Sequence, residues 1–339
     1  WPICRPVVTL GQYSGARWGR VMLLREAEVV LRDWTSDSRR WADVPLRAGD
    51  IIVATSPKCG TTWTQRILGM MLSGSPDPVA VQDVYPWIDM RVKPMDQIQD
   101  ALARQWQATG RRSMKTHSPL DALPLHDDVL YIHVARDARD ACMSWHNHVG
   151  GYTAMTRAML DHFGTTDESI GAPFPPFRED PQAFFRAFVG HPDYAPPTEF
   201  SIGSYCTLAN SYWSQRHRSN VLLVHYNDLS VDLSGEMRRI ADFCAIDVDP
   251  RLWPQLVDAA SFAAMKRDGA ALMPTAAMVW QGGSDRFLNQ GTNQRWRAVL
   301  SDEDLADYDA AATAGMSPAL RAWSEGGRLA AGDPRSLPN

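Results

Sequence analysis

A chain of 339 residues with 45% hydrophobic and 22% charged residues can bury a sizeable core, and its net charge of −5 excludes a general basic field that recruits nucleic acid. The five cysteines are scattered and include no Cys-x-x-Cys pair, which argues against a zinc site or a disulfide framework and favours a reducing, cytoplasmic compartment. No apolar run approaches the about 20 residues of a membrane span, and Arg5, Arg17 and Arg20 interrupt the apolar patches at the start of the chain, so neither a span nor a signal peptide is expected.

Strand-like and helix-like patterns alternate along most of the chain. Residues 23–31 suit a short helix, and the apolar run at 50–54 predicts a first buried strand. Apolar residues at helical spacing follow over 61–72, and a segment rich in Ser, Gly and Pro ends this helix at 73–78. Further strands are predicted over 113–117, 129–134 and 220–226. Further helices are predicted over 95–108, 204–216, 233–244, 251–260 and 261–268, and another begins near residue 137. A last helix is predicted over 302–312.

This alternation predicts an α/β fold with a central parallel β-sheet flanked by helices. Residues 150–200 lack a steady period and are interpreted as a lid or substrate loop, and residues 270–298 are expected to be rich in loops. No repeat or Pro/Gly-rich linker divides the chain, so we predict a single domain. This domain covers residues 1–339. Its expected parts are an N-terminal extension over 1–43, a core at about 44–300, and a C-terminal helix and tail over 301–339.

The segment 54–63, with the sequence Ala-Thr-Ser-Pro-Lys-Cys-Gly-Thr-Thr-Trp, joins the first predicted strand to the first predicted helix. Free backbone N–H groups and the positive end of the helix dipole should face this loop. Lys58 adds a cation, Thr61 and Thr62 add hydroxyl groups, and Gly60 allows the backbone to approach a ligand closely. The sequence therefore predicts an anion site. It differs from the nucleotide triphosphatase P-loop, because Lys58 precedes Gly60 and no Gly opens the loop.

A second anion site is predicted after the strand at 129–134. Arg136 follows the strand, and Ser144 lies eight residues further on, in the next helix. Ligands of open α/β sheets collect beyond the carboxyl ends of strands, and a guanidinium group can bind a phosphate through two hydrogen bonds. A simple ion pair of Arg136 with Asp137 or Asp140 is the alternative interpretation.

Lys115 and His117 lie at the end of a predicted strand and share one face of it. Together they supply a cation and a group that can act as a base near neutral pH. Of the other histidines, two lie inside predicted strands and are interpreted as core residues (His133 and His225), and two are candidates for a pocket wall (His146 and His148).

Residues 54–63 resemble the 5′-phosphosulfate loop of the cytosolic-type sulfotransferase family, whose donor is 3′-phosphoadenosine 5′-phosphosulfate (PAPS). Arg136 and Ser144 resemble the family's 3′-phosphate motif. The resemblance extends from about residue 50 to residue 296 and implies a P-loop-like sulfotransferase fold. It implies that His117 is the general base, with Lys115 beside it, and that Lys58 is the cation on the leaving group. The loop residues that it assigns to the donor are Lys58, Cys59, Gly60, Thr61, Thr62 and Trp63.

Two further segments resemble the family's adenosine site. Tyr226 follows the strand at 220–226 as does the family's Tyr that touches the nucleotide. Ser261, Phe262 and Met265 match the family's Ser-Phe-x-x-Met segment, whose aromatic and Met side chains sandwich the adenine. The resemblance also implies that Trp63 stacks on the other side of the base. Judged by spacing alone, Phe262 and Met265 would be an ordinary apolar helix face.

The C-terminal match is incomplete. The family's Arg-Lys-Gly-x-x-Gly-x-Trp segment corresponds to residues 289–296, where Gly291 and the Trp are retained. Asn289 and Gln290 replace the two cations that bind the 3′-phosphate, which removes charge-assisted contacts of about 1–3 kcal/mol. Three nearby cations are candidates to compensate: Arg286, Arg295 and Arg297.

The chain is therefore expected to be a PAPS-dependent sulfotransferase that acts without a metal and releases adenosine 3′,5′-bisphosphate (PAP). The expected acceptor is a hydroxyl group of an apolar, phenolic or glycolipid molecule. Segments 85–87, 115–121 and 322–328 look most like actinobacterial glycolipid or aryl sulfotransferases. Two alternatives stay open: a nucleotide-dependent phosphotransferase of the P-loop class, and a nucleotide-binding protein with weakened catalysis. The sequence leaves the oligomeric state open, with a homodimer among the options.

Overall fold

A sheet of four parallel strands forms the centre of the structure, a computed structural model that describes residues 21–194 and 200–338. The order of the strands across the sheet is β3-β2-β5-β6. Their bounds are Ile51–Thr55 for β2, Ser113–Thr116 for β3, Leu130–Ala135 for β5 and Val221–His225 for β6. All their residues except Leu130 are buried, as expected for a parallel sheet covered on both faces. The predicted α/β fold with a central parallel sheet is confirmed.

The register brings the carboxyl ends of the strands to one edge of the sheet. Ala54 in β2 pairs with Thr116 at the end of β3, and Ala135 at the end of β5 pairs with His225 at the end of β6. The loops that leave the strands therefore start side by side. These loops carry Lys58, His117 and Arg136, and Tyr226 begins the helix that directly follows β6.

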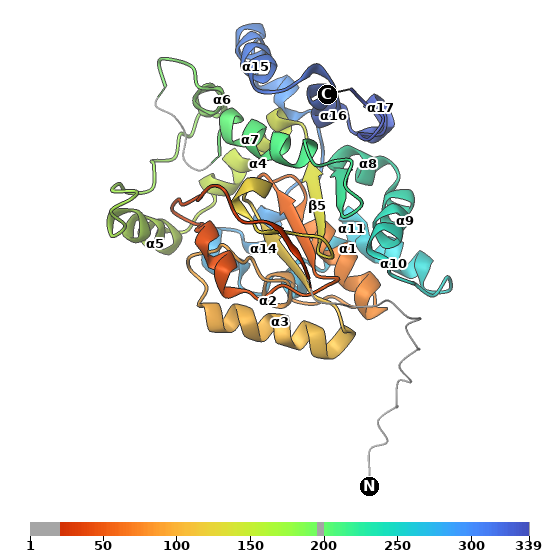
Figure 1. Ribbon diagram of the computed structural model, residues 1–339. Helices are drawn as coiled ribbons and strands as arrows, with labels where there is room; N and C mark the ends of the chain where they lie inside the picture. The colour runs from red at the N-terminus through yellow and green to blue at the C-terminus, as the bar shows by residue number, and fades with distance from the viewer. Residues whose placement is uncertain (1–20, 195–199, 339) are drawn as a thin grey trace.

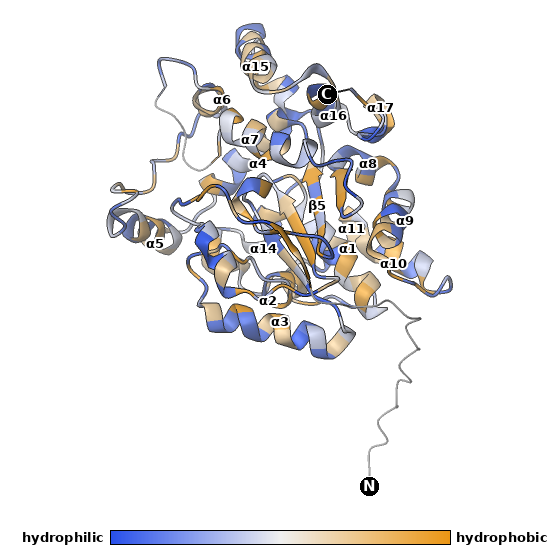
Figure 2. Ribbon diagram, in the orientation of Figure 1, coloured by the Kyte–Doolittle hydropathy of each residue, from blue (hydrophilic) through white to orange (hydrophobic). Residues whose placement is uncertain are grey.

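Helices cover both faces of this sheet (Figure 1). The longer ones are α1 (Thr61–Ser73), α3 (Met95–Thr109), α4 (Ala138–Gly150), α5 (Ala154–Thr165), α6 (Pro181–Val189), α7 (Ile202–Trp213), α9 (Leu233–Cys244), α10 (Trp253–Ala260), α15 (Asp302–Gly315) and α16 (Pro318–Gly326). The shorter ones are α2 (Val81–Val84), α8 (Tyr226–Val231), α11 (Phe262–Arg267), α12 (Gly269–Leu272), α13 (Ala276–Val279), α14 (Gly283–Phe287) and α17 (Arg328–Ala331). Helix α1 packs against β3, α9 and α10, whereas α7 packs against β6, α15 and α16. Figure 2 shows hydrophobic residues concentrated on the strands between these layers.

The prediction of a short helix over 23–31 is wrong. Residues Leu23–Arg25 form strand β1, which pairs antiparallel with β4 (Leu125–His126). The N–H groups of Glu28 and Val29 donate to the carbonyl of Asp121. These partners satisfy backbone groups that a helix would satisfy within the segment, so pairing with a distant part of the chain decides the local structure.

Residues 150–200 contain two helices, α5 and α6, where an irregular loop was expected. Each helix begins at a capping side chain, since Thr153 accepts the N–H of Thr156 and Asp180 accepts the N–H groups of Gln182 and Ala183. The helix over 302–312 is not the last one either, because α16 and α17 follow α15. None of the helices in the described parts of the chain is both long and apolar enough to cross a membrane.

Candidate active site

A cavity of about 920 Å³ lies at the carboxyl edge of the sheet. It reaches from the loop between β2 and α1 to the segments around α5 and α13. The predicted site residues that line it are Lys58, Gly60, Thr61, Thr62, Trp63, Lys115, His117, Arg136, Ser144, Tyr226, Phe262, Met265, Asn289, Gln290 and Gly291. The sequence thus identified residues from distant segments that the fold brings to one place.

Cys59 and Ser261 are not among the lining residues. The Cys59 side chain is buried, and its Sγ lies 3.7 Å from the carbonyl of Pro57. Burial raises the pKa of this thiol to about 12. The Ser261 side chain accepts the N–H of Ala264 and so caps α11. Ser261 therefore fixes the backbone at the start of α11, whereas Cys59 belongs to the buried core.

The loop before α1 has two residues with positive φ, Lys58 at 66° and Gly60 at 109°. A side chain at Gly60 would meet the ring of Tyr226 at 3.2 Å. Gly60 is the N-cap of α1 and makes no side-chain hydrogen bond to the first turn, so the N–H groups of this turn are available to an anion. The Thr61 hydroxyl lies 2.6 Å from that of Thr55 at the end of β2.

The Lys58 ammonium group is held between two aromatic side chains. Its Nζ lies 3.4 Å from Nδ1 of His148 and 3.9 Å from the centre of the Phe287 ring. Burial, followed by the charges of Arg136 and Lys115, lowers the pKa of Lys58 to about 7. A bound anion would reverse this shift, because it would favour the charged form.

His117 has a defined tautomer. Its Nδ1 lies 2.7 Å from the backbone carbonyl of Thr55, and a carbonyl only accepts hydrogen bonds, so Nδ1 carries the proton. Burial and the charge of Lys115 lower the pKa of His117 to about 3, so the ring is neutral at physiological pH. In a neutral ring with Nδ1 protonated, Nε2 has the free lone pair that a general base needs.

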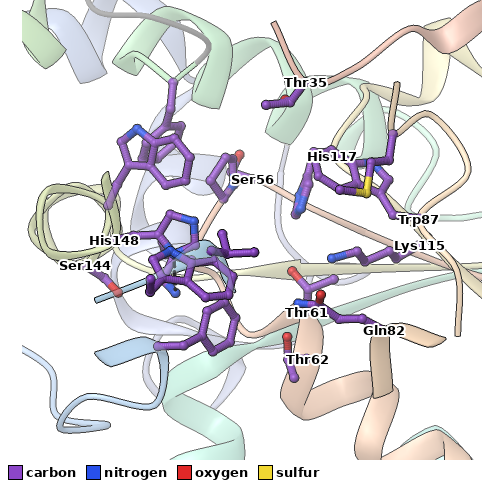
Figure 3. A pocket seen from close by; sticks show the side chains of 18 of the residues that line it. Thr35, Ser56, Thr61, Thr62, Gln82, Trp87, Lys115, His117, Ser144 and His148 are labelled. Carbon is purple, nitrogen blue, oxygen red and sulfur yellow. Dashed lines mark hydrogen bonds between the residues drawn. The ribbon is translucent and has the colours of Figure 1, made fainter. Parts of the chain in front are cut away.

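Lys115 lies next to this histidine, and both contact Trp87. The Lys115 ammonium group is 5.0 Å from the centre of the Trp87 ring, and the ring centres of Trp87 and His117 are 4.8 Å apart. Burial lowers the pKa of Lys115 to about 8. Figure 3 shows Lys115 and His117 extending into the same space, with His148 on its other side.

Asp89 supports the end of β3, and no sequence pattern predicted it as a site residue. Its Oδ2 accepts hydrogen bonds from the hydroxyl groups of Thr116 at 2.8 Å and Ser118 at 2.6 Å, which flank His117. Burial raises the pKa of Asp89 to about 6, and its charge favours the protonated form of Lys115. The residue lies in the loop after α2 without a repeating pattern, so only its contacts identify it.

Arg136 lies over the ring of Tyr226, with its guanidinium carbon 4.3 Å from the ring centre. It donates to Asn293 Oδ1 from Nε at 3.0 Å and from Nη2 at 2.8 Å, and to the carbonyl of Thr292 at 3.0 Å. The alternative ion pair with Asp137 or Asp140 is not formed. Asp137 binds Arg139 and caps α4, and Asp140 Oδ1 accepts the N–H of Arg295. The guanidinium group thus faces neutral oxygens, which an anionic ligand could replace.

Aromatic residues surround the end of the cavity near Arg136. The rings of Trp63 and Tyr226 meet edge to face at 5.2 Å, and the Trp63 Nε1 donates to the Ala260 carbonyl at 2.7 Å. Gly291 packs on Phe262, because a Cβ at Gly291 would lie 2.6 Å from that ring. These contacts bring the segment around Gly291 against α11, on the side of the cavity that also holds Arg136.

The other half of the cavity has an aromatic wall around His148. Its ring is 4.8 Å from that of Trp145, 4.9 Å from Trp280 and 5.7 Å from Phe287. His148 therefore lines the cavity as predicted, whereas Nε2 of His146 bonds the carbonyls of Arg178 and Glu179. Trp280 and Phe287 were missed, since they lie in the segment expected to be rich in loops.

The two histidines predicted to be core residues are confirmed as such. His133 is 2% exposed, and its Nδ1 lies 3.1 Å from the Ala54 carbonyl. His225 is fully buried, and its Nε2 lies 2.9 Å from the carbonyl of Ser324. Both belong to strands of the central sheet. Among the expected compensating cations, Arg295 lines the cavity.

Comparison with known proteins identifies the family. The family model of the sulfotransferase domain matches residues 48–318. A glycolipid sulfotransferase of Mycobacterium bovis is 32% identical over 318 residues, which cover 88% of this chain and 95% of the relative. The luciferin sulfotransferase of Photinus pyralis is 25% identical over 296 residues, which cover 78% of this chain and 70% of that protein.

Solved structures agree at the level of the fold. Retinol dehydratase in complex with retinol and PAP has a TM-score of 0.59 and 20% identity, and the match covers 84% of this chain and 87% of that one. A mouse sulfotransferase complexed with PAP has a TM-score of 0.59 and 17% identity, with 84% and 91% of the two chains covered. By its sequence relatives and its matching domain, the chain belongs to the sulfotransferase domain family.

Proposed function

We propose that this sulfotransferase takes a sulfuryl group from PAPS and transfers it to a hydroxyl group of an apolar, phenolic or glycolipid acceptor, with His117 as the general base. The observation that carries the proposal is the hydrogen bond from His117 Nδ1 to the Thr55 carbonyl. It leaves Nε2 unprotonated in the cavity that also holds Lys58 and Lys115. A base and two cations in one cavity suit the transfer of an anionic group.

In the proposed reaction, Nε2 of His117 takes the proton of the acceptor hydroxyl while the acceptor oxygen bonds to sulfur. The bond between sulfur and the bridging oxygen of the 5′-phosphate breaks, and negative charge develops on the departing PAP. Lys58 and the N–H groups at the start of α1 stabilise that charge, and Lys115 is a second cation near the sulfuryl oxygens.

The proposed nucleotide site uses the cavity end near Arg136. The guanidinium group replaces its hydrogen bonds to Asn293 and Thr292 with hydrogen bonds to the 3′-phosphate. The Ser144 hydroxyl, which also lines the cavity, binds the same phosphate. Phe262, Met265 and Trp63 surround the adenine, as the family resemblance implies. Two structural relatives solved with PAP support this choice of donor.

The proposed acceptor class follows from the other half of the cavity. Its wall is largely aromatic and aliphatic, as suits a ligand with an apolar part. The Mycobacterium bovis relative is named a glycolipid sulfotransferase, which supports the same class. We also propose a cytoplasmic location, because the four described cysteines are free thiols.

Labelled-sulfate transfer from PAPS tests the proposal, with phenols, long-chain alcohols and glycolipids as acceptors. We expect transfer by the wild type and a loss of at least about a hundredfold in kcat for His117→Ala, with little change in PAP affinity. His146→Ala is a matched control, since His146 is bonded to Arg178 and Glu179 outside the cavity wall, and it should retain transfer.

Other outcomes separate the alternatives. An unchanged kcat in folded His117→Ala would contradict the assignment of the base. Magnesium-dependent ATP turnover without sulfate transfer would favour a phosphotransferase. Tight PAP binding without transfer to any acceptor would favour a nucleotide-binding protein that has lost catalysis.

A further inference from the structure

Two exposed methionines lie on the rim of the cavity. Met155 in α5 and Met278 in α13 are each 58% exposed, and both line the cavity. Methionine side chains are flexible and polarizable, and they are common on surfaces that bind apolar ligands of varied shape. The two residues therefore give the cavity an apolar opening to solvent.

The backbone that carries these methionines is fixed. The Thr153 hydroxyl donates to the carbonyl of Met278 at 2.9 Å, and the Thr153 N–H donates to that of Val279 at 3.0 Å. The Thr156 hydroxyl adds a bond to the Val279 carbonyl at 3.1 Å. The first turn of α5 is thus tied to the end of α13, and the two exposed methionine side chains extend from segments that these hydrogen bonds join.

A set of contacts leads from Lys58 toward this opening. Lys58 contacts His148 at 3.4 Å, and the His148 ring is 4.9 Å from Trp280 and 5.4 Å from Tyr152. Tyr152 and Trp280 pair through their backbones; Tyr152 precedes Thr153, the N-cap of α5, and Trp280 directly follows α13. The remaining apolar residues of this part of the wall are Met159, Leu160 and Val279.

Another part of the rim has the opposite character. Gln82 and Asp83 in α2, Lys93, and Gln97 in α3 all line the cavity there. The Lys93 ammonium group lies 3.7 Å from Asp83 Oδ1, so this part of the rim carries paired charges. A ligand that fills the cavity thus meets polar groups near α2 and apolar groups near α5 and α13.

We propose that the acceptor is an amphiphile whose unbranched alkyl chain leaves the cavity between Met155 and Met278. This inference rests on the proposed function, and it adds the acceptor class and the residues that select it. The hydroxyl-bearing head lies at His117, the chain runs along the wall of His148 and Trp280, and the methionines cover its distal part.

The test is the dependence of kcat/KM on chain length, measured with PAPS and phenols that carry para-alkyl chains from ethyl to octyl, below their micelle concentrations. Each value is divided by that of the same variant with unsubstituted phenol. We expect the wild-type ratio to rise about threefold for each added methylene that contacts the wall. In the double variant Met155→Glu/Met278→Glu, the rise should stop at the chain length that reaches the rim.

Two controls are matched to this variant. Met155→Leu/Met278→Leu keeps an apolar rim and should keep the full rise. Val231→Glu places the same charge on an apolar residue that is 77% exposed and lies in α8, outside the cavity wall, and it should also keep the rise.

The outcomes distinguish the two proposals. A flat chain-length series in a wild type that sulfates phenol would overturn the alkyl exit and leave the proposed function standing. The same would follow from an equal rise in the wild type and the double glutamate variant. If the wild type transfers sulfate to none of the acceptors, the proposed function fails, and this inference fails with it.

Discussion

Lys58 is the residue of the site whose charge depends most directly on pH near neutrality. Its pKa is lowered to about 7, first by burial and then by Arg136 and Lys115, so free enzyme loses this charge as the pH rises through 7. A bound phosphate restores the charge by proton uptake. We therefore predict that the affinity for PAP falls above pH 7, by at most about tenfold for each pH unit.

Calorimetry of PAP binding in buffers of different ionisation enthalpy measures this uptake directly. At about pH 8, binding to the wild type should take up protons, whereas Lys58→Arg should take up fewer because arginine stays charged. Lys115, with a pKa of about 8, contributes a smaller share in both proteins. Equal proton uptake by the wild type and Lys58→Arg would contradict the prediction.

Arg136 permits a second test, because its proposed role concerns only one phosphate of the ligand. Arg136→Ala removes the charged partner of the 3′-phosphate, so the affinity for PAP should fall about ten- to a hundredfold. The affinity for adenosine 5′-phosphate, which lacks that group, should change little. Titration of both nucleotides checks this, and an equal loss for both would show that the residue acts through the structure of the site.

Some site residues could be predicted from the sequence and others could not, and the reason is physical. Lys58, His117 and Arg136 follow strands, and parallel strands end at one edge, so their proximity could be predicted from the strand pattern. Asp89 and Trp280 lie in loops whose position depends on distant packing, such as the hydrogen bonds from Thr116 and Ser118 or the pairing with Tyr152. Nothing local marks such residues.

At the level of elements, the contact between α1 and α2 depends on a glycine. A Cβ at Gly69 in α1 would overlap the hydroxyl group of Tyr85, the C-cap residue of α2. Alanine gains about 1 kcal/mol over glycine in a helix, but overpacking typically costs about 1–3 kcal/mol and more where a ring cannot move. We predict that Gly69→Ala lowers the free energy of unfolding by about 1–2 kcal/mol.

Urea denaturation measures this change, with Gly203→Ala as the matched control. Gly203 lies in the first turn of α7, and a Cβ there would meet only the Ser201 hydroxyl oxygen, at 3.7 Å. This substitution should be neutral or stabilising. If Gly69→Ala were as stable as Gly203→Ala, the packing of Tyr85 on α1 would not restrict this position.

Helix starts are a part of the fold that local sequence could have predicted better. Thr153 and Asp180 are capping residues in front of α5 and α6, yet the Gly- and Pro-rich composition around them favoured an irregular loop. Strand β1 is a different case, because its partner β4 lies about a hundred residues away in sequence. A pattern within 23–31 carries no information about that partner.

On the scale of the whole molecule, the C-terminal helices complete the core around the sheet. Trp323 in α16 is fully buried, and its ring centre is 5.6 Å from that of His225 in β6 and 6.2 Å from that of His133 in β5. The buried apolar strands made a parallel sheet predictable. The segments that cover each face of the sheet were not predictable, because their choice depends on complementary shapes of side chains.

His133 links this core to the stability of the whole protein. It is buried in β5 with its ring stacked 4.9 Å from that of Tyr212, and burial lowers its pKa to about 4. Unfolded chains take up a proton at this histidine below about pH 6.5, whereas the folded protein does so only below about pH 4. The histidine therefore lowers the stability as the pH falls through this window, by up to about 1.4 kcal/mol for each pH unit.

His133→Phe keeps the ring but loses the hydrogen bond to the Ala54 carbonyl, which is worth about 1 kcal/mol. The wild type should thus be more stable by about 1 kcal/mol at pH 7.5, where the histidine is neutral in both states. At pH 5.0 the wild type has lost about 2 kcal/mol relative to the variant, so the order should reverse. Urea denaturation at the two pH values measures the free energy of unfolding of both proteins. An equal difference between wild type and variant at both pH values would contradict the lowered pKa. A histidine with the same pKa in the folded and unfolded states cannot change its contribution to stability with pH.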